Sequence, residues 1–186
     1  MTLPKPLSLS HQFLRGAISP GDRVVDATLG NGYDTAFLAG LVGPEGRVTG
    51  FDVQADALVA TRERLGDLAG RCELVHAGHE TMAQKVRGGV AAVVFNLGYL
   101  PGADKELVTQ RETTLAALER AAGLLKVRGV LSVMCYPGHA GGAEEVAAVK
   151  EWFAGLGRRE WRVFEYSALN APNSPPSLLV GEKVGL

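Results

Sequence analysis

One acid and two glycines stand together near the start of the chain, in Asp26-Ala27-Thr28-Leu29-Gly30-Asn31-Gly32. Glycines and small residues let the backbone approach a ligand closely, and the helix expected to follow offers unpaired N–H groups. Asp52 lies 22 residues after Gly30, at the end of the next expected strand. A carboxylate there can accept hydrogen bonds from both ribose hydroxyls of an adenosine. The spacing therefore predicts a site for an adenosine-containing cofactor.

Two cofactor classes fit this pattern, a dinucleotide and S-adenosylmethionine. A dinucleotide fingerprint closes with a third Gly or Ala beside the pyrophosphate, but Thr35 stands there, preceded by Asp34. An acid in the first turn of a helix suits the helix dipole and repels a pyrophosphate, and Asp26 adds another negative charge. S-Adenosylmethionine carries an ammonium and no phosphate, so the acids favour it. Two structural alternatives stay open: Asp34 as a helix N-terminal charge, and Asp26 as an acceptor for loop amides.

A second polar group follows the fourth expected strand, in Phe95-Asn96-Leu97-Gly98-Tyr99-Leu100-Pro101-Gly102. Ligands bind at the carboxyl edge of a central parallel strand. Asn96-x-x-Tyr99 resembles the Asn-Pro-Pro-Tyr motif of amino-methyltransferases, with Leu-Gly in place of Pro-Pro. The Asn96 carbonyl can accept hydrogen bonds from an amine and aim its lone pair, and the Tyr99 ring can stack on a base. The alternative is a turn, where Asn and Gly are common for conformational reasons.

Two more clusters are expected at the same edge of the sheet. Tyr136 and His139 follow the fifth strand and could face the substrate. His139 could take a proton from an ammonium substrate, or it could only cap or pack its glycine loop. Asn170 opens the proline-rich stretch 170–176, which is either a rigid turn or a lid.

The third expected strand ends near a pair of histidines. Gly78 and His79 stand where adenine contacts lie in such sheets. His76 and His79 are three residues apart, whereas zinc motifs on helices place two histidines at i and i+4 around a glutamate. We therefore expect no metal site here.

Strands alternate with helices along the chain. The expected strands are residues 23–27, 47–51, 72–76, 91–95, 130–135, 161–167 and 177–183. The expected helices are residues 35–42, 55–68, 80–86, 107–125 and 143–156, and His11 is expected on the surface or in a helix. This alternation implies a parallel sheet covered on both faces, and the missing crossover helix before the last strand implies an antiparallel terminal hairpin. We predict an α/β fold: one Rossmann-like class I methyltransferase domain over residues 1–186, with seven strands, mostly parallel.

Composition and charge narrow the classes of protein to which this chain can belong. With 46% hydrophobic and 21% charged residues, the chain is typical of soluble globular proteins, and no apolar run reaches the roughly 18–20 residues of a membrane span. Residues 1–10 contain no secretory signal, and Cys72 and Cys135 lack metal-ligand spacing, so we expect a reduced cytoplasmic protein without a membrane partner. The net charge of −1 gives no support for tight nonspecific binding of nucleic acid, although a local basic patch stays open.

These segments together resemble the YtqB-like methyltransferases, a family long labelled rRNA methylases. The resemblance rests on residues 26–32, 51–54, 78–80, 96–102 and 136–139 and covers nearly the whole chain. It implies methylation of the 5-aminomethyl nitrogen of tRNA wobble uridine, which gives 5-methylaminomethyl-(2-thio)uridine. It also implies cofactor contacts from Asn31, Asp52, Gln54 and His79. Tyr33 departs from the His or Asn expected at its position, and Tyr136-Pro137 stands where a second polar residue is expected.

We therefore expect an S-adenosylmethionine-dependent N-methyltransferase acting on tRNA. A homodimer that assembles the RNA surface across two copies stays open. The expected catalytic residues are Asn96, Tyr99 and His139. The expected cofactor residues are Asp26, Thr28, Gly30, Asn31, Gly32, Asp52, Gln54, Gly78, His79 and Asn96. The expected substrate residues are Tyr99, Tyr136, His139 and Asn170. The alternatives are methylation of ribosomal RNA or a small amine, an RNA module that only binds an adenosine ligand, and a dehydrogenase.

Overall fold

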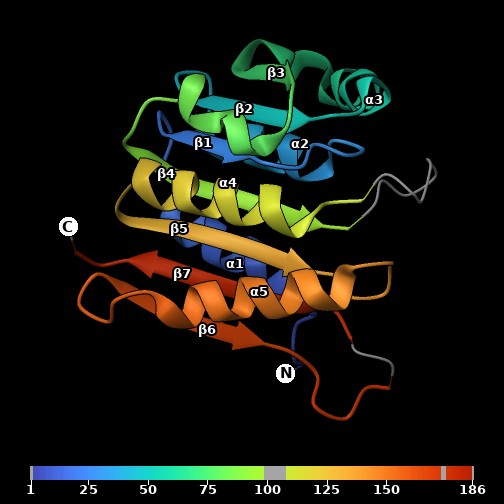
Figure 1. The fold of residues 1–186 in the computed structure, drawn as a ribbon. Helices are drawn as coiled ribbons and strands as arrows, with labels where there is room; N and C mark the ends of the chain where they lie inside the picture. Colours follow the sequence, from blue (N-terminus) through green and yellow to red (C-terminus); the bar gives the residue numbers. More distant parts are fainter. Residues whose placement is uncertain (1, 99–107, 173–174, 186) are drawn as a thin grey trace.

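One sheet organises the molecule, which is described here from a computed structural model covering residues 2–98, 108–172 and 175–185 (Figure 1). Within the described residues, the strands of the sheet follow the order β3-β2-β1-β4-β5-β7-β6. The strands are β1 (Arg23–Asp26), β2 (Arg47–Asp52), β3 (Cys72–His76), β4 (Val90–Leu97), β5 (Leu125–Cys135), β6 (Trp161–Tyr166) and β7 (Ser177–Lys183). Strands β1 to β5 pair in parallel, and β7 runs antiparallel to both β5 and β6. The predicted seven-stranded, mostly parallel α/β fold with an antiparallel terminal pair is confirmed.

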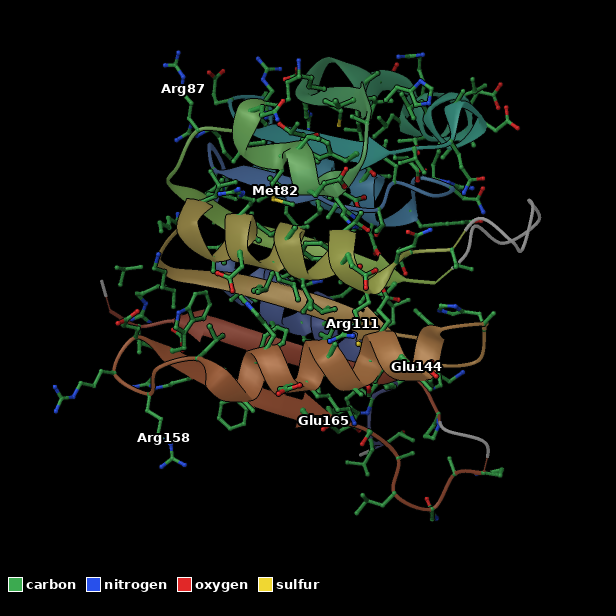
Figure 2. The ribbon with its side chains drawn as sticks, in the orientation of Figure 1. Met82, Arg87, Arg111, Glu144, Arg158 and Glu165 are labelled. Atoms are coloured by element: carbon green, nitrogen blue, oxygen red, sulfur yellow. The ribbon has the colours of Figure 1, made fainter. Side chains whose placement is uncertain are left out.

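Helices cover both faces of the sheet. They are α1 (Pro6–Ala17), α2 (Tyr33–Val42), α3 (Ala55–Leu65), α4 (Arg111–Leu124) and α5 (Gly142–Gly155), with two 3₁₀ helices, η1 (Gly66–Arg71) and η2 (His79–Gln84). In Figure 1, α4 and α5 lie in front of the sheet, while α1 and α2 lie behind it. Figure 2 shows Met82 between η2 and α4, where it is fully buried.

The central strand β4 explains this layering. Its first six residues, Val-Ala-Ala-Val-Val-Phe, are all apolar and all buried, as expected for a strand covered on both sides. Val93 and Phe95 belong to the core beneath α4 and α5, whereas Val94 belongs to the core beneath α1 and α2. The alternation of side chains along the strand therefore contributes to two separate cores at once.

Several predicted boundaries were wrong. The helix expected over 107–125 begins at Arg111 and ends at Leu124, and its predicted start at residue 107 lies outside the described residues. The helix expected over 55–68 ends at Leu65, because Gly66 adopts a positive φ of 49° that interrupts it. The segment predicted as helix 80–86 is the shorter 3₁₀ helix η2.

Strand β5 also begins earlier than expected, at Leu125 rather than at residue 130. Its pairing with β4 shifts register between Val90 and Ala92, and Arg128 beside the shift has a positive φ of 67°. An irregularity of this kind lets a strand continue through a segment whose pattern looks like a turn.

The N-terminal helix α1 was not predicted. It begins with Pro6 in its first turn, and it packs against β5 and β7 through Ser10 and Leu14, which are both buried. Within the described ranges, no helix is long and apolar enough to cross a membrane. That residues 1–186 form one domain stays a prediction.

The order of the strands places a switch point between β1 and β4. The chain moves outward from β1 to β2 and β3, then returns to the other side of β1 at β4 and continues to β5. At such a point the loops after two neighbouring strands diverge, and ligands bind in the crevice between them. The loop after β1 and the end of β4 meet here.

Candidate functional site

Asp26 organises the loop after β1 from beneath. Its side chain is completely buried: one carboxylate oxygen accepts the backbone N–H of Thr28 at 3.1 Å, and the other accepts the hydroxyl of Thr35 at 2.6 Å. Burial, together with the nearby Asp34 carboxylate, raises the pKa of Asp26 to about 7. Asp26 therefore shapes the loop, which was the structural alternative for this residue.

Asp52 joins the same loop to the end of β2. Its Oδ2 accepts the backbone N–H of Gly30 at 3.0 Å, and its Oδ1 accepts the backbone N–H of Gln54 at 2.9 Å. Each carboxylate oxygen has a second lone pair, so both can still accept hydroxyl groups from a ligand. Asp52, Gly30 and Gln54 all line the same cavity.

Glycine is required at position 32 on two grounds. Gly32 has a φ of 77°, in the left-handed region, and it immediately precedes α2. A Cβ added there would lie 2.7 Å from the Cα of Thr61 in α3. The Thr61 hydroxyl donates to the carbonyl of Gly30 at 3.3 Å, so α3 and the loop fit closely.

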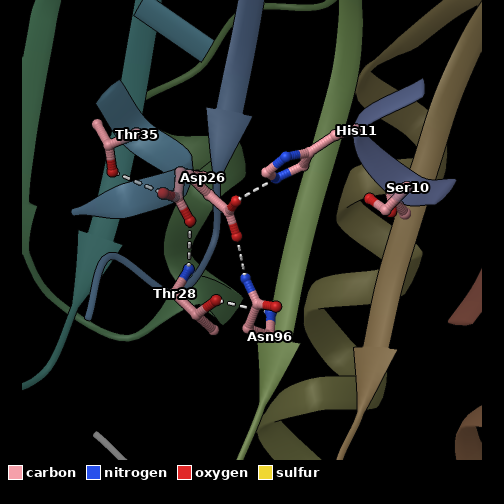
Figure 3. A network of polar contacts seen from close by, with 8 residues as sticks. Ser10, His11, Asp26, Thr28, Thr35 and Asn96 are labelled. Carbon is pink, nitrogen blue, oxygen red and sulfur yellow. Dashed lines mark hydrogen bonds and ion pairs between the residues drawn. The ribbon is translucent and has the colours of Figure 1, made fainter. Parts of the chain in front are cut away.

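Asn96, the penultimate residue of β4, is tied to the loop after β1. Its backbone N–H donates to the hydroxyl of Thr28 at 2.8 Å, and its side-chain Nδ2 donates to Asp34 Oδ2 at 2.5 Å (Figure 3). The switch point therefore brings the predicted acceptor residue and the predicted cofactor loop into direct contact.

His79 closes the cavity on the side of β1. Its ring is buried, and because a carbonyl only accepts, Nδ1–H donates to the carbonyl of Ala27 at 3.1 Å. Burial lowers the pKa of His79, which favours the neutral ring with a lone pair on Nε2. Such a ring can accept a hydrogen bond from a ligand, as an adenine amino group would donate.

A cavity of about 1390 Å³ lies over these residues. Its wall includes most of the predicted cofactor residues, namely Thr28, Gly30, Asn31, Asp52, Gln54, Gly78, His79 and Asn96. In the described part of the chain, the wall contains three carboxylates (Asp34, Asp52 and Glu80) and no lysine or arginine. This charge suits a cationic ligand without phosphate and disfavours a pyrophosphate.

Tyr136 and His139 line the opposite side of the cavity, after β5. Burial, with a smaller contribution from Asp34, raises the pKa of Tyr136, so its hydroxyl stays protonated near neutral pH. His139 donates from Nδ1 to the carbonyl of Ala140 at 3.0 Å, which leaves the lone pair of the neutral ring on Nε2. That Nε2 is buried and has no hydrogen-bond partner among the described residues.

The buried Glu145 of α5 holds this side of the cavity together. Its two carboxylate oxygens accept the hydroxyls of Thr109, at 2.7 Å, and Thr114, at 2.6 Å. The backbone N–H of Thr109 in turn donates to the carbonyl of Gly98 at 2.9 Å. Thr109 lines the cavity, so Glu145 fixes one part of its wall without touching the interior.

Not every predicted site residue lines the cavity. Asp26 lies beneath the loop, and Gly32 is part of the loop itself, but neither lines the cavity. Asn170 is exposed and outside the cavity wall. Tyr99 lies outside the described residues. Pro172, Pro175 and Pro176 from the same loop as Asn170 do line the cavity, so the loop reaches the site through its prolines.

The prediction missed the contribution of α1. Leu7 and His11, one helical turn apart, line the cavity, and His11 Nε2 contacts Asp34 Oδ1 at 2.7 Å. One signal was available in the sequence: Pro6 is followed by Ser10, Leu14 and Ile18 at helical spacing, and this pattern marks a buried helix face.

Known proteins match this chain in sequence and in fold. The family model described as "putative rRNA methylase" matches residues 48–182. The chain is 37% identical over 183 residues to the Arabidopsis thaliana protein named tRNA (mnm(5)s(2)U34)-methyltransferase, chloroplastic, and the match covers 92% of this chain and 67% of that protein.

Two bacterial structures match over nearly their whole length. A protein from Clostridium thermocellum, described as a "putative rRNA-methylase", superimposes with a TM-score of 0.96 and 42% identity, covering 99% of this chain and all of that one. A protein from Streptococcus mutans, described as "a putative methyltransferase" and solved in complex with SAH, superimposes with a TM-score of 0.90 and 38% identity, covering 98% of this chain and all of that one. With the family model matching most of its length, this chain belongs to the rRNA methylase family that its motifs predicted.

Proposed function

We propose that this chain methylates the amino nitrogen of the 5-aminomethyl group on the wobble (2-thio)uridine of tRNA. The chain is an S-adenosylmethionine-dependent RNA methyltransferase, as its family and its relatives indicate. The tRNA substrate and the exact nitrogen are the proposal. The observation that carries it is the position of Asn96 at the end of β4, in contact with the loop after β1.

The cavity is suited to S-adenosylmethionine. The carboxylate of Asp52, held by two backbone amides, can accept the ribose hydroxyls, and the neutral His79 ring can accept from adenine. Among the described residues, the cavity wall has carboxylates and no lysine or arginine. This negative charge favours a ligand that carries a sulfonium and an ammonium over a dinucleotide. Pockets for one small molecule commonly measure roughly 300–1,000 Å³, so about 1390 Å³ leaves room for part of a second substrate.

When bound, S-adenosylmethionine supplies an electrophilic methyl group on a sulfonium centre. Asn96 Oδ1 accepts an N–H of the substrate amine and thereby directs the nitrogen lone pair toward the cofactor loop. The amine nitrogen forms the new bond with its lone pair, the electrons of the broken carbon–sulfur bond stay on sulfur, and the nitrogen releases one proton. The protein mainly contributes proximity and orientation.

An aliphatic amine is mostly protonated at neutral pH, so the site must favour its neutral form. His139 is a candidate for this task, because it lines the cavity and its Nδ1 donates to the Ala140 carbonyl, which leaves Nε2 as the acceptor atom of the ring. We assign His139 Nε2 as the acceptor of the ammonium proton before transfer. Tyr99, predicted to pack on the uridine, keeps that role as a prediction.

The test is methyl transfer to defined RNA pools. Purified protein and S-adenosylmethionine are incubated with bulk tRNA that carries 5-aminomethyl-2-thiouridine and, separately, with ribosomal RNA, and the nucleosides are analysed by mass spectrometry. We expect loss of 5-aminomethyl-2-thiouridine and gain of its methylamino product in tRNA only. Methylation confined to ribosomal RNA or to free amines would transfer the function to those substrates, and no transfer to any RNA would favour a module that only binds.

A further inference from the structure

Asp34 connects three elements that are far apart in the sequence. Its Oδ2 accepts Asn96 Nδ2 of β4 at 2.5 Å, and its Oδ1 accepts His11 Nε2 of α1 at 2.7 Å (Figure 3). Asp34 itself stands in the first turn of α2. One carboxylate therefore joins α1, α2 and β4 at the wall of the cavity.

The chemistry of a carboxylate determines which atoms face it. An ionised Asp34 can only accept hydrogen bonds, so the atom of the Asn96 carboxamide that faces it must be the nitrogen. The same argument requires His11 to present an N–H from Nε2. The Asn96 carboxamide then has its oxygen as the atom left to accept a hydrogen bond from an amine.

His11 is held firmly from the other side. Its ring stacks on Phe37 of α2, with centroids 4.0 Å apart and planes 12° from parallel. The neighbouring Ser10 hydroxyl forms a hydrogen bond of 2.7 Å with Ser132 of β5, and both serines are buried. The position of His11 is thus set by the docking of α1 on the sheet.

We propose that His11 and Asp34 are positioning residues, which hold the Asn96 carboxamide with Oδ1 toward the acceptor amine. Without Asp34, the carboxamide can turn over and present Nδ2, which donates and cannot accept an amine N–H. His11 maintains the Asp34 carboxylate in the geometry that Asn96 requires. This inference rests on the proposed amine methylation and extends it to a helix that lies outside the cofactor loop.

The first experiment observes the contact directly and needs no RNA. In ¹⁵N-labelled protein, the side-chain amide signals of Asn96 are assigned by their loss in Asn96→Ala. We expect one Nδ2–H signal downfield of free amides, with slow solvent exchange, and its return to the free range in Asp34→Ala. An Asn96 signal that is unchanged in Asp34→Ala overturns the proposal.

The second experiment separates positioning from binding. We expect His11→Leu and Asp34→Ala to lower kcat about 10- to 100-fold, while KM for tRNA changes less than about threefold in both variants. The Kd for the cofactor should change less than about threefold in His11→Leu, which keeps all three carboxylates of the cavity wall. His11→Gln should recover most of the kcat, because its terminal N–H₂ can reach Asp34 much as Nε2 does.

A matched control accompanies these variants. Glu165→Gln removes the carboxylate of the surface ion pair with Lys150, far from Asp34 in the sequence. This variant should keep the kcat of the wild type. A wild-type kcat in His11→Leu overturns the proposal, as does an unchanged kcat with a much weaker cofactor Kd in Asp34→Ala. A wild type that methylates no RNA overturns the proposed function instead, while the amide signal still decides whether Asp34 holds Asn96.

Discussion

The backbone N–H of Asn96 donates to the hydroxyl of Thr28 at 2.8 Å, although the two residues are 68 positions apart. The bond joins the end of β4 to the loop after β1, at the point where the order of the strands reverses. Cofactor binding and acceptor orientation therefore depend on one continuous piece of structure. The predictions below separate the two.

Asn96→Ala should abolish turnover and leave cofactor binding intact. The variant keeps the backbone N–H that contacts Thr28 and loses only the carboxamide, so the loop after β1 should hold its shape. We expect kcat on tRNA to fall about 100-fold or more, because the amine is no longer oriented. Calorimetry with S-adenosylhomocysteine should give a Kd within about threefold of the wild type. Gln84→Ala, which removes an exposed carboxamide, is the matched control. Normal turnover in Asn96→Ala would remove Asn96 from the mechanism.

Asp52→Ala should weaken binding of the cofactor and leave the fold intact. The variant loses the acceptor for the Gly30 and Gln54 amides and for the ligand hydroxyls. We expect the calorimetric Kd for S-adenosylmethionine to rise about 10- to 100-fold, which is typical when hydrogen bonds to a charged group are lost. The exposed carboxylate of Asp56, four residues later, provides the control Asp56→Ala.

In the same titration, wild-type protein should bind S-adenosylmethionine and not NAD, and binding of NAD alone would restore the dehydrogenase alternative.

Asp26→Asn should change how stability depends on pH. The pKa of Asp26 is raised from 3.8 in the unfolded chain to about 7 in the fold, mainly by burial. A raised folded-state pKa contributes stability below about pH 4, and that contribution is lost as the pH rises through about 7. Between these limits the free energy of unfolding of the wild type should fall by up to about 1.4 kcal/mol per pH unit from this group.

The asparagine variant should lack that slope. Its Oδ1 can accept the Thr28 N–H and its Nδ2 can donate to the Thr35 hydroxyl, so both contacts of Asp26 have a neutral equivalent. Urea unfolding without cofactor is measured at pH 5, 6, 7 and 8. The free energy of unfolding of the variant should rise relative to that of the wild type as the pH rises. Asp56→Asn should follow the wild type, and parallel curves for Asp26→Asn and wild type would contradict the assignment.

Gly32→Ala should destabilise the cofactor loop. Alanine at a φ of 77° costs roughly 1–2 kcal/mol, and its Cβ would meet the backbone of Thr61 at 2.7 Å. Overpacking of this kind costs about 1–3 kcal/mol more, so we expect a total loss of about 2–5 kcal/mol in urea unfolding. Gly40→Ala in α2, where nothing lies within 4 Å, should instead gain up to about 1 kcal/mol. Equal stabilities for the two variants would show that the loop tolerates the extra carbon.

Local patterns in the sequence predicted much of the fold and the cofactor half of the candidate site. The apolar run of β4 predicted a buried central strand, and Gly30 and Asp52 at their spacing predicted two loops that meet. These features could be predicted because a strand that is buried on both faces, and an acid at its end, leave a mark within a few residues.

The acceptor half of the site depended on packing. Asp34 could not be assigned from the sequence, where a helix charge and a ligand contact were equally good interpretations, and the tertiary structure places it between His11 and Asn96. Helix α1, which brings His11, was missed because it has no side-chain cap at its N-terminus and only a short apolar face.

The sequence by itself determined the α/β class, the edge of the sheet that holds the site, and the acids and glycines of the cofactor loop. Only the tertiary structure decided that Asp26 supports the loop from inside the core and that α1 completes the cavity wall. The physical reason is distance along the chain. Hydrophobic periodicity and turn chemistry act over a few residues, whereas the hydrogen bonds that Asp34 accepts from His11 and Asn96 join positions 23 and 62 residues away.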